Sequence, residues 1–340
     1  MEYFGNKTEV DDNPAWTPPA ESTAAQTPPE QLVTGEITTI TAAPQPEEEI
    51  TESGKYAVSI PAAALLNTSS LSAYAAKASS EGYTAALVWL KDNAGNIRYN
   101  SEITDGEQVV GALTATEISV VLSQNDLIPI AVVSVLKDNA GCIDNPDMSY
   151  KIYNEENVSW LDYKSGTPVR WANPESTATS EYNKAVVGEL FAAGFKRVIL
   201  SDIVFPNFQD YDREFIAAKY FSSDRYKYLT SIIFDGTDVM ADAEDIILNS
   251  FTGTAEFLRS RAELTDKTLF VRIKRDAFSA ENGYPAAAPA LFEDVMSQVS
   301  LMSPTKNVVP VIEGVGFTPT EIAAMKETAE KMGYSEFYVW

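Results

Sequence analysis

The sequence contains no histidine and only one cysteine, Cys142. Without histidine, neither a Ser-His-Asp nor a Cys-His catalytic arrangement can form, and imidazole-ligated metal sites are excluded as well. Any acid–base chemistry must therefore come from Asp, Glu, Tyr or Lys. A single cysteine excludes an intramolecular disulfide and a thiolate metal cluster. It fits a low-cysteine protein outside the cytoplasm, although a cytoplasmic protein is also compatible.

Basic residues and long apolar runs are also scarce. The chain has 25 Lys and Arg against 49 Asp and Glu, for a formal net charge of -24. Such a surface repels phosphates, so we expect no nucleic acid and no anionic membrane as a partner, whereas a neutral glycan is compatible. No stretch reaches the roughly 18 apolar residues of a membrane span. The first residues lack a signal-peptide apolar core, so if the protein is exported, its signal or anchor lies outside this sequence.

Residues 1–54 differ in composition from the rest of the chain. They hold eleven acidic residues against one lysine, Lys7, and seven of the 18 prolines. Such a segment cannot bury enough apolar surface to offset the entropy of ordering it, so we predict a disordered acidic linker rich in Pro, Thr and Glu. Linkers of this kind often hold a domain away from a cell surface, and a plain unstructured tail fits equally well.

From residue 55 to residue 340, apolar runs alternate with amphipathic stretches, which is typical of parallel βα units. Strands are predicted at 56–62, 85–90, 128–136, 198–202, 269–274, 300–302, 308–312 and 336–340, with helices near 70–81, 114–123, 180–193, 242–262, 288–298 and 319–332. Eight strands with interleaved helices predict a single α/β domain, a (β/α)8 TIM barrel. The link between 300–302 and 308–312 is too short for a full helix, so one βα unit is expected to be degenerate.

An internal repeat supports the βα pattern. Leu-Lys-Asp-Asn-Ala-Gly occurs at 90–95 and again at 136–141, each time just after a predicted strand. Asp-Asn-Ala-Gly favours a turn, because glycine adopts the left-handed conformation at no steric cost. The two turns are either purely structural, or they bring Asp92 or Asp138 to a site at the barrel mouth.

Three acidic residues end predicted strands: Asp92, Asp202 and Glu313. A glycosidase needs two carboxyl groups on either side of the bond, about 5–5.5 Å apart for retention of configuration or about 6.5–9.5 Å for inversion. Barrel closure would bring Asp202 and Glu313 across one mouth, so they are the candidate catalytic pair. Each could instead cap the turn or helix that follows it.

Two further groups of residues have alternative interpretations. Trp89, Trp160, Trp171 and Trp340 fall at predicted strand ends or in the long loop after the third strand, where they would either stack on sugar rings or pack in the interior. The acidic cluster at 235–245 lacks the ligand spacing of a calcium loop. Acids at this position favour the start of a helix, so we predict a helix there and no metal or cofactor.

The motifs in this order resemble a bacterial family of glycoside-hydrolase-like (β/α)8 barrels distantly related to α-amylase-type enzymes. The resemblance covers residues 56–340. It is carried by Lys91, Asp92, Gly95 and Tyr99, by the Lys137-Asp138 pair, by Trp171-Ala172-Asn173-Pro174 with Tyr182 and Glu189, by Gly194-Phe195 and Phe205-Pro206 around the fourth strand, and by Gly333 to Trp340.

The departures from the family pattern fall on its polar positions. Ser201 occupies the place of the fourth-strand aspartate, and Asp202 lies one residue later, a shift that flips a side chain to the other face of a strand. The other replaced positions are Trp89, Val132, Val204 and Glu313-Gly314. The resemblance therefore implies the family fold with a degenerate catalytic site.

These observations predict a glycoside-hydrolase-like protein, extracellular or at the cell surface, that acts on or binds polysaccharide or cell-wall glycan. The alternative is a non-catalytic interaction or scaffolding protein of the cell envelope. Besides the catalytic candidates Asp202 and Glu313, the predicted substrate-binding residues are Trp89, Lys91, Asp92, Tyr99, Asp138, Trp171 and Ser201.

Overall fold

The computed structural model describes residues 56–340 apart from 105, 107, 164–165, 248–257, 259–263, 304 and 306. The predicted linker at 1–54 lies outside the described residues, as does most of the helix predicted at 242–262.

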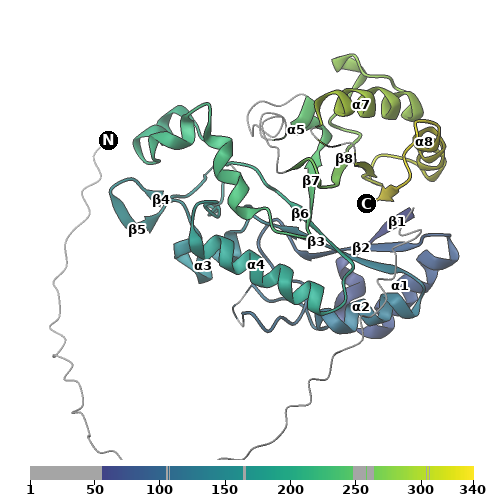
Figure 1. The fold of residues 1–340 in the computed structure, drawn as a ribbon, viewed down its shortest axis with the longest axis horizontal. Coiled ribbons are helices and arrows are strands. Elements are labelled where there is room, and N and C mark those ends of the chain that lie inside the picture. The colour runs from purple at the N-terminus through teal and green to yellow at the C-terminus, as the bar shows by residue number, and fades with distance from the viewer. Residues whose placement is uncertain are drawn as a thin grey trace, which may run out of the picture. The chain divides into compact units, whose positions relative to one another are not determined.

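Eight parallel strands close into a barrel, which confirms the predicted (β/α)8 fold (Figure 1). Around the barrel, the strands follow the order β1-β10-β9-β8-β7-β6-β3-β2. Their bounds are β1 (Tyr56–Ile60), β2 (Ala85–Lys91), β3 (Ile128–Ser134), β6 (Arg197–Ser201), β7 (Asp238–Asp242), β8 (Leu269–Ile273), β9 (Val308–Ile312) and β10 (Phe337–Val339). A separate hairpin consists of β4 (Lys151–Ile152) and β5 (Glu155–Ser159).

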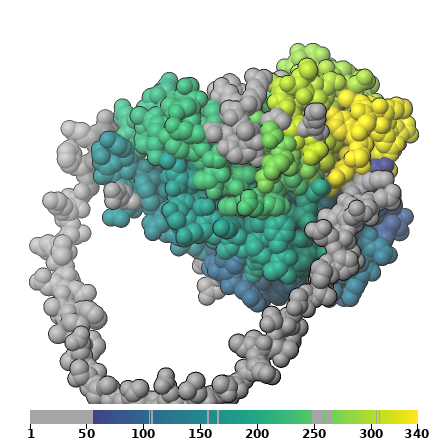
Figure 2. Space-filling view, in the orientation of Figure 1, coloured from purple at the N-terminus to yellow at the C-terminus, as the bar shows by residue number. Residues whose placement is uncertain are grey.

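The described helices connect the strands. The α-helices are α1 (Thr68–Ser80), α2 (Ala115–Gln124), α3 (Asn139–Asp144), α4 (Thr177–Ala192), α5 (Ala243–Ile247), α7 (Ala288–Met302) and α8 (Pro319–Lys331). The 3-10 helices are η1 (Ala62–Leu66), η2 (Pro146–Met148), η3 (Asp210–Glu214), η4 (Ala218–Phe221), η5 (Arg225–Ile232) and η7 (Ala280–Asn282). In the space-filling view, the segments from β4 to η5 form the surface on the left, and α7 and α8 form the surface at the upper right (Figure 2).

The barrel interior is apolar in its middle. Its buried residues include Leu87, Val132, Ile199, Met240 and Phe270. Residues two apart on a strand share a face. The positions two residues after Ile199, Met240 and Phe270 therefore also point inward, at the carboxyl ends of β6, β7 and β8. Those positions are Ser201, Asp242 and Arg272. The alternation of the strands thus places polar side chains in the top layer of the barrel.

Two sequence predictions about the elements were wrong. Residues 238–242, where no strand was predicted, form strand β7, whose end residues are paired by arginines of the neighbouring strands, and the predicted helix start follows it directly as α5. Residues 300–302, predicted as a strand, are the last residues of the fifteen-residue helix α7. The degenerate unit therefore lies elsewhere. It follows β6, where η3, η4 and η5 stand in place of one long helix.

The two copies of the repeated hexapeptide fold differently, so the expectation of two identical turns was also wrong. In the first copy, the Asp92 carboxylate accepts hydrogen bonds from the amides of Ala94 and Asn96, both at 2.9 Å, and closes a turn. In the second copy, Asp138 caps α3 by accepting a hydrogen bond from the Gly141 amide at 2.9 Å. Each copy thus uses its aspartate locally, but within a different structure.

The two copies are also joined by a fully buried ion pair. Lys91 Nζ lies 2.6 Å from Asp138 Oδ2, and neither side chain is exposed. The ammonium donates two more hydrogen bonds, to the Ser134 carbonyl at 3.0 Å and to Asn183 Oδ1 at 2.9 Å. Gly95 has φ +90°, and a Cβ there would lie 2.1 Å from Asp138 Oδ1. The pair therefore fixes the loops after β2 and β3 against each other and against α4.

We expect Lys91→Met to lower the free energy of unfolding by about 3–5 kcal/mol, because it leaves the Asp138 carboxylate buried without a counter-charge. Urea denaturation of the full chain measures this loss. The matched control is Lys77→Met, which removes an ion pair of 3.8 Å to Glu81 between two largely exposed side chains and should cost less than about 1 kcal/mol. Equal losses in the two variants would contradict the assigned role of the buried pair.

Candidate functional site

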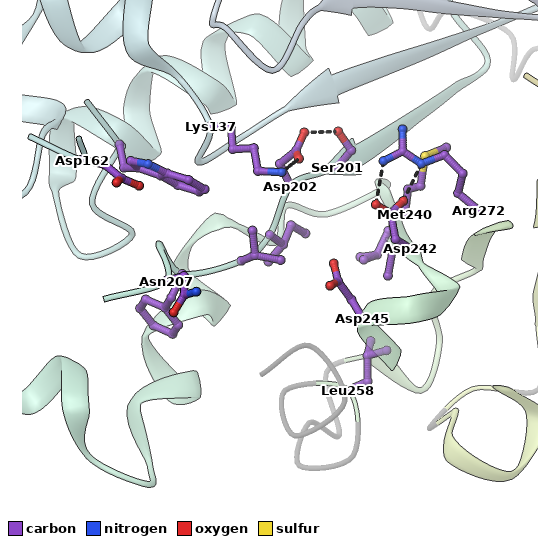
Figure 3. A pocket seen from close by; sticks show the side chains of 16 residues that line it. Lys137, Asp162, Ser201, Asp202, Asn207, Met240, Asp242, Asp245, Leu258 and Arg272 are labelled. Atoms are coloured by element: carbon purple, nitrogen blue, oxygen red, sulfur yellow. Dashed lines mark hydrogen bonds and ion pairs between the residues drawn. The ribbon is translucent and has the colours of Figure 1, made fainter. Parts of the chain in front are cut away.

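A cavity of about 320 Å³ opens at the carboxyl ends of β6, β7 and β8, the end at which barrel enzymes carry their sites (Figure 3). We call it the mouth cavity. Its lining combines charged groups with apolar side chains from the same strands and loops. The charged lining residues are Lys137, Asp162, Asp202, Asp242, Asp245 and Arg272, and Ser201 contributes a hydroxyl group.

Asp202 reaches this cavity through an unusual backbone conformation. Strand β6 ends at Ser201, and Asp202 has φ +55°, in the left-handed region that few residues other than glycine, asparagine and aspartate adopt. Its carboxylate accepts a hydrogen bond from Ser201 Oγ at 3.0 Å and lies on the cavity wall. The strand alternation expected from the sequence therefore does not extend to this residue. Strained positions of this kind are concentrated at functional sites.

Lys137 supplies the counter-charge of Asp202. Its Nζ lies 3.0 Å from Asp202 Oδ1 and 5.9 Å from the centre of the Trp171 ring, which also lines the cavity. The two lysines of the repeat thus act alike. Lys91, at the end of β2, pairs with the aspartate after β3, and Lys137, just after β3, pairs with the aspartate after β6.

Asp242 is the centre of a second charged cluster. It forms a two-pronged ion pair with Arg272, in which Nη2 to Oδ2 measures 2.8 Å, and Lys274 Nζ lies 2.6 Å from Oδ2. Burial opposes ionisation, but the hydrogen bonds and charges of Arg272 and Lys274 outweigh it and lower the pKa of Asp242. Lys274 also contacts Glu244 Oε1 at 2.9 Å. Burial and the charge of Asp242 raise the pKa of Glu244.

Among the residues predicted from the sequence, Asp202, Ser201 and Trp171 line the mouth cavity together. Glu313 follows β9, is half-buried and is not part of the described lining, so the structure does not place the predicted catalytic pair in one cavity. Glu313 nevertheless acts electrostatically on Arg272. Burial alone would lower the pKa of that guanidinium, but Asp242, together with Asp202 and Glu313, raises it.

The other predicted binding residues lie outside the mouth cavity. Trp89 packs edge-to-face on Trp340 at the top of the barrel interior, with 4.4 Å between ring centres. Tyr99 is buried and donates a hydrogen bond of 2.6 Å to Glu189. Asp92 is paired with Arg98 at 3.1 Å. With the buried Lys91 and Asp138, these residues stabilise the loops around the mouth.

Asp242, Arg272 and Asp245 were not predicted as site residues from the sequence. Two sequence signals pointed to Asp242 and Arg272, and none pointed to Asp245. An arginine sits inside the apolar run of β8, and an aspartate sits at each end of the short run Asp-Val-Met-Ala-Asp. A charged residue in a buried strand is uncommon unless it is paired, so such residues mark partners on adjacent strands.

The described residues contain no helix long and apolar enough to cross a membrane. Over the same residues, no three Cys, Asp or Glu side chains are grouped so that they could hold a metal ion.

A closed barrel of eight parallel strands with helices between them is a (β/α)8 barrel, and it carries a charged cavity at its carboxyl end. The chain belongs to the family described as "Putative glycosyl hydrolase domain", whose model matches residues 57–271. This confirms the resemblance inferred from the motifs. No protein of curated function matches the chain.

One solved structure supports the fold, and a second is similar over part of the chain. The catalytic domain of β-amylase from Paenibacillus polymyxa is similar with a TM-score of 0.53 and 12% identity, over 84% of this chain and 92% of that chain. A hypothetical protein from Ruminiclostridium thermocellum has a TM-score of 0.44 and 17% identity, over 56% of this chain and all of that chain. At these identities the β-amylase similarity supports the fold alone.

We expect Asp242→Asn to lower the free energy of unfolding by about 3 kcal/mol at pH 7, because Arg272 and Lys274 lose their shared counter-charge. The folded-state pKa of Asp242 lies below its ordinary value of 3.8, so its contribution is complete above that pH and is lost as the pH falls through the lowered pKa. The difference between wild type and variant should therefore shrink at acid pH.

Urea denaturation at pH 7 and at pH 3 measures both parts of this prediction. Asp210→Asn is the control, because the Asp210 side chain is fully exposed and should show no difference at either pH. The assigned pairing is refuted if the difference in the free energy of unfolding between wild type and Asp242→Asn is as large at pH 3 as at pH 7, or larger.

Proposed function

We propose that the mouth cavity binds the end of a glycan chain. The observation that carries this proposal is the composition of the cavity. The Trp171 ring, a carboxylate at Asp202 and the Lys137 ammonium converge on one recess of about 320 Å³. A flat ring fits the apolar face of a sugar, and the carboxylate and ammonium fit its hydroxyl groups. The volume is at the small end of ligand pockets, which favours a chain end over a long internal segment.

The charges of the cavity favour binding over hydrolysis. A glycosidase needs one carboxyl group that holds a proton and delivers it to the leaving group. Asp202 is ion-paired with Lys137, and the pKa of Asp242 is lowered. Glu244, whose pKa is raised, contacts Lys274 and is not part of the described lining. The two paired aspartates are therefore suited to accept hydrogen bonds from sugar hydroxyls.

Hydrolysis is the second candidate, and Asp245 is the observation that favours it. Its carboxyl group lies in the same cavity as those of Asp202 and Asp242 (Figure 3). In this alternative, Asp245 donates the proton and Asp202 is the carboxylate partner. The pair predicted from the sequence, Asp202 with Glu313, stays a prediction.

The proposal also includes the location of the protein. The acidic linker composition of residues 1–54 and the single cysteine support a location outside the cytoplasm, where a glycan of the cell envelope or the surroundings is the partner. If no glycan binds, the alternative of a cell-envelope scaffolding protein gains support. Protease treatment of intact cells that produce the native protein tests the location, because a surface protein is digested and a cytoplasmic one is protected.

Calorimetric titration with neutral oligosaccharides tests the binding proposal. We expect at least one glycan to bind wild type and Asp202→Asn to bind it at least tenfold more weakly, because the variant loses the carboxylate and its pairing with Lys137. Asparagine also tolerates the left-handed conformation, so the fold should be kept, and circular dichroism checks this. The control is Asp266→Asn, at an exposed position before β8 and therefore at the end of the barrel opposite the mouth, with unchanged affinity.

The same samples are assayed for new reducing ends. Release by wild type that is lost in Asp245→Asn would favour the hydrolytic alternative over binding alone. The binding proposal fails if no oligosaccharide binds wild type, or if Asp202→Asn binds it as tightly as wild type does.

A further inference from the structure

Exposed aromatic side chains gather on one part of the molecule. Among the described residues, five aromatic side chains are classed as exposed, and four of them come from the excursions that follow β3 and β6. They are Tyr153 (61% exposed), Tyr163 (61%), Tyr211 (59%) and Phe215 (43%). We call these four residues the aromatic strip. The fifth, Tyr74, lies on α1.

The two excursions are in direct contact. The Tyr153 amide donates a hydrogen bond of 2.6 Å to the Phe215 carbonyl, which joins the β4–β5 hairpin to the end of η3. Trp160 Nε1 donates to Asp212 Oδ1 at 3.1 Å and makes a second link between the hairpin side and η3. Figure 1 shows the β4–β5 hairpin and the green segment that follows β6 on the same side of the barrel. Figure 2 shows the two as adjoining parts of one surface.

A packed layer of aromatic rings joins the same two excursions. The rings of Tyr150, Trp160, Phe208 and Tyr220 contact one another edge-on or tilted, with centres 5.0–6.4 Å apart. Because this layer is buried or half-buried and joins the two excursions, it fixes the backbone that carries the exposed rings, which lowers the entropy cost of ordering them around a ligand.

Both excursions that carry the strip also contribute residues to the lining of the mouth cavity. Asp162 is buried and lines the cavity, and the next residue in the chain is Tyr163. On the other excursion, Asn207 lines the cavity and η3, which carries Tyr211, begins three residues later. A ligand that extends out of the cavity on this side therefore meets the strip.

We propose that the aromatic strip binds the continuation of the glycan chain whose end lies in the mouth cavity. The inference rests on the proposed function and assigns the strip to the chain units outside the cavity. Flat tyrosine and phenylalanine rings stack on the apolar faces of sugar rings, and the tyrosine hydroxyls remain free to hydrogen-bond to sugar hydroxyls. Acidic neighbours of the strip, such as Asp210 and Glu214, select against an anionic polymer. The occupant is therefore a neutral glycan.

The composition of the strip argues against a protein as the occupant. The central patch of a protein interface is depleted in charged residues. Here Asp210, Arg213 and Glu214 lie between or beside the exposed rings on η3. Separate rings among charged side chains suit a narrow polar chain better than a broad apolar partner.

The test compares a disaccharide with a hexasaccharide of the same neutral sugar and linkage, drawn from α- and β-linked glucose and N-acetylglucosamine series. Wild type should bind the hexasaccharide more tightly than the disaccharide. Tyr163→Ala and Tyr211→Ala should each weaken hexasaccharide binding about 3- to 10-fold, the range expected for one aromatic contact, and leave disaccharide binding unchanged. Tyr211→Phe, which keeps the ring, should retain most of the affinity.

Tyr74→Ala is the matched control, because it removes an exposed tyrosine from a helix on the outside of the barrel and should change neither affinity. The inference is overturned if Tyr163→Ala and Tyr211→Ala weaken disaccharide and hexasaccharide binding equally, or if they weaken neither. In both cases the proposed binding in the mouth cavity still stands. Absence of binding by wild type at either length would instead overturn the proposed function, and the inference with it.

Discussion

Lysine–aspartate ion pairs that cross from the end of one strand to the loop after the next hold the mouth of the barrel in shape. The pair of Lys91 with Asp138 is fully buried, and its ammonium also contacts Ser134 and Asn183, so one charge joins the ends of β2 and β3 to α4. Because Asp138 is fixed in this way, the residue before it, Lys137, is directed to Asp202, which directly follows β6, the next strand of the barrel. The lining of the cavity thus depends on a contact outside it.

The right-hand wall of the cavity in Figure 3 depends on Asp242 in the same way. Its carboxylate balances Arg272 and Lys274, which come from β8 and the residue after it. Without that carboxylate, two cations would face each other in the top layer of the barrel. The cavity is therefore bounded by two paired carboxylates, a preorganised set of acceptors whose charges are already compensated.

Much of the barrel could be predicted from the sequence, because seven of its strands are apolar runs bounded by turn or helix signals. Strand β7 could not. Only two of its five residues are buried, and the aspartates at its ends look like helix caps until Arg197 and Arg272 are known to lie on either side. The strand exists because of pairing between distant residues, which no local pattern records. The identical hexapeptides also show that the local sequence is not sufficient, because their surroundings make one a turn and the other a helix start.

The candidate site was predictable only in part. Strand alternation correctly directs Ser201 inward, but the same rule directs Asp202 away from the mouth, and the left-handed backbone at Asp202 reverses that outcome. Such a conformation is set by the end of the strand and by the hydrogen bonds and ion pair of the carboxylate. The exposed tyrosines had no sequence signal, since their importance lies in where the excursions after β3 and β6 place them.

A crystal structure of the protein soaked with an oligosaccharide that it binds tests the central claim most directly. We predict a terminal sugar unit in the mouth cavity, against the Trp171 ring and with its hydroxyls hydrogen-bonded to Asp202. A sugar bound elsewhere on the barrel, with the mouth cavity free of sugar at saturating concentration, would contradict it.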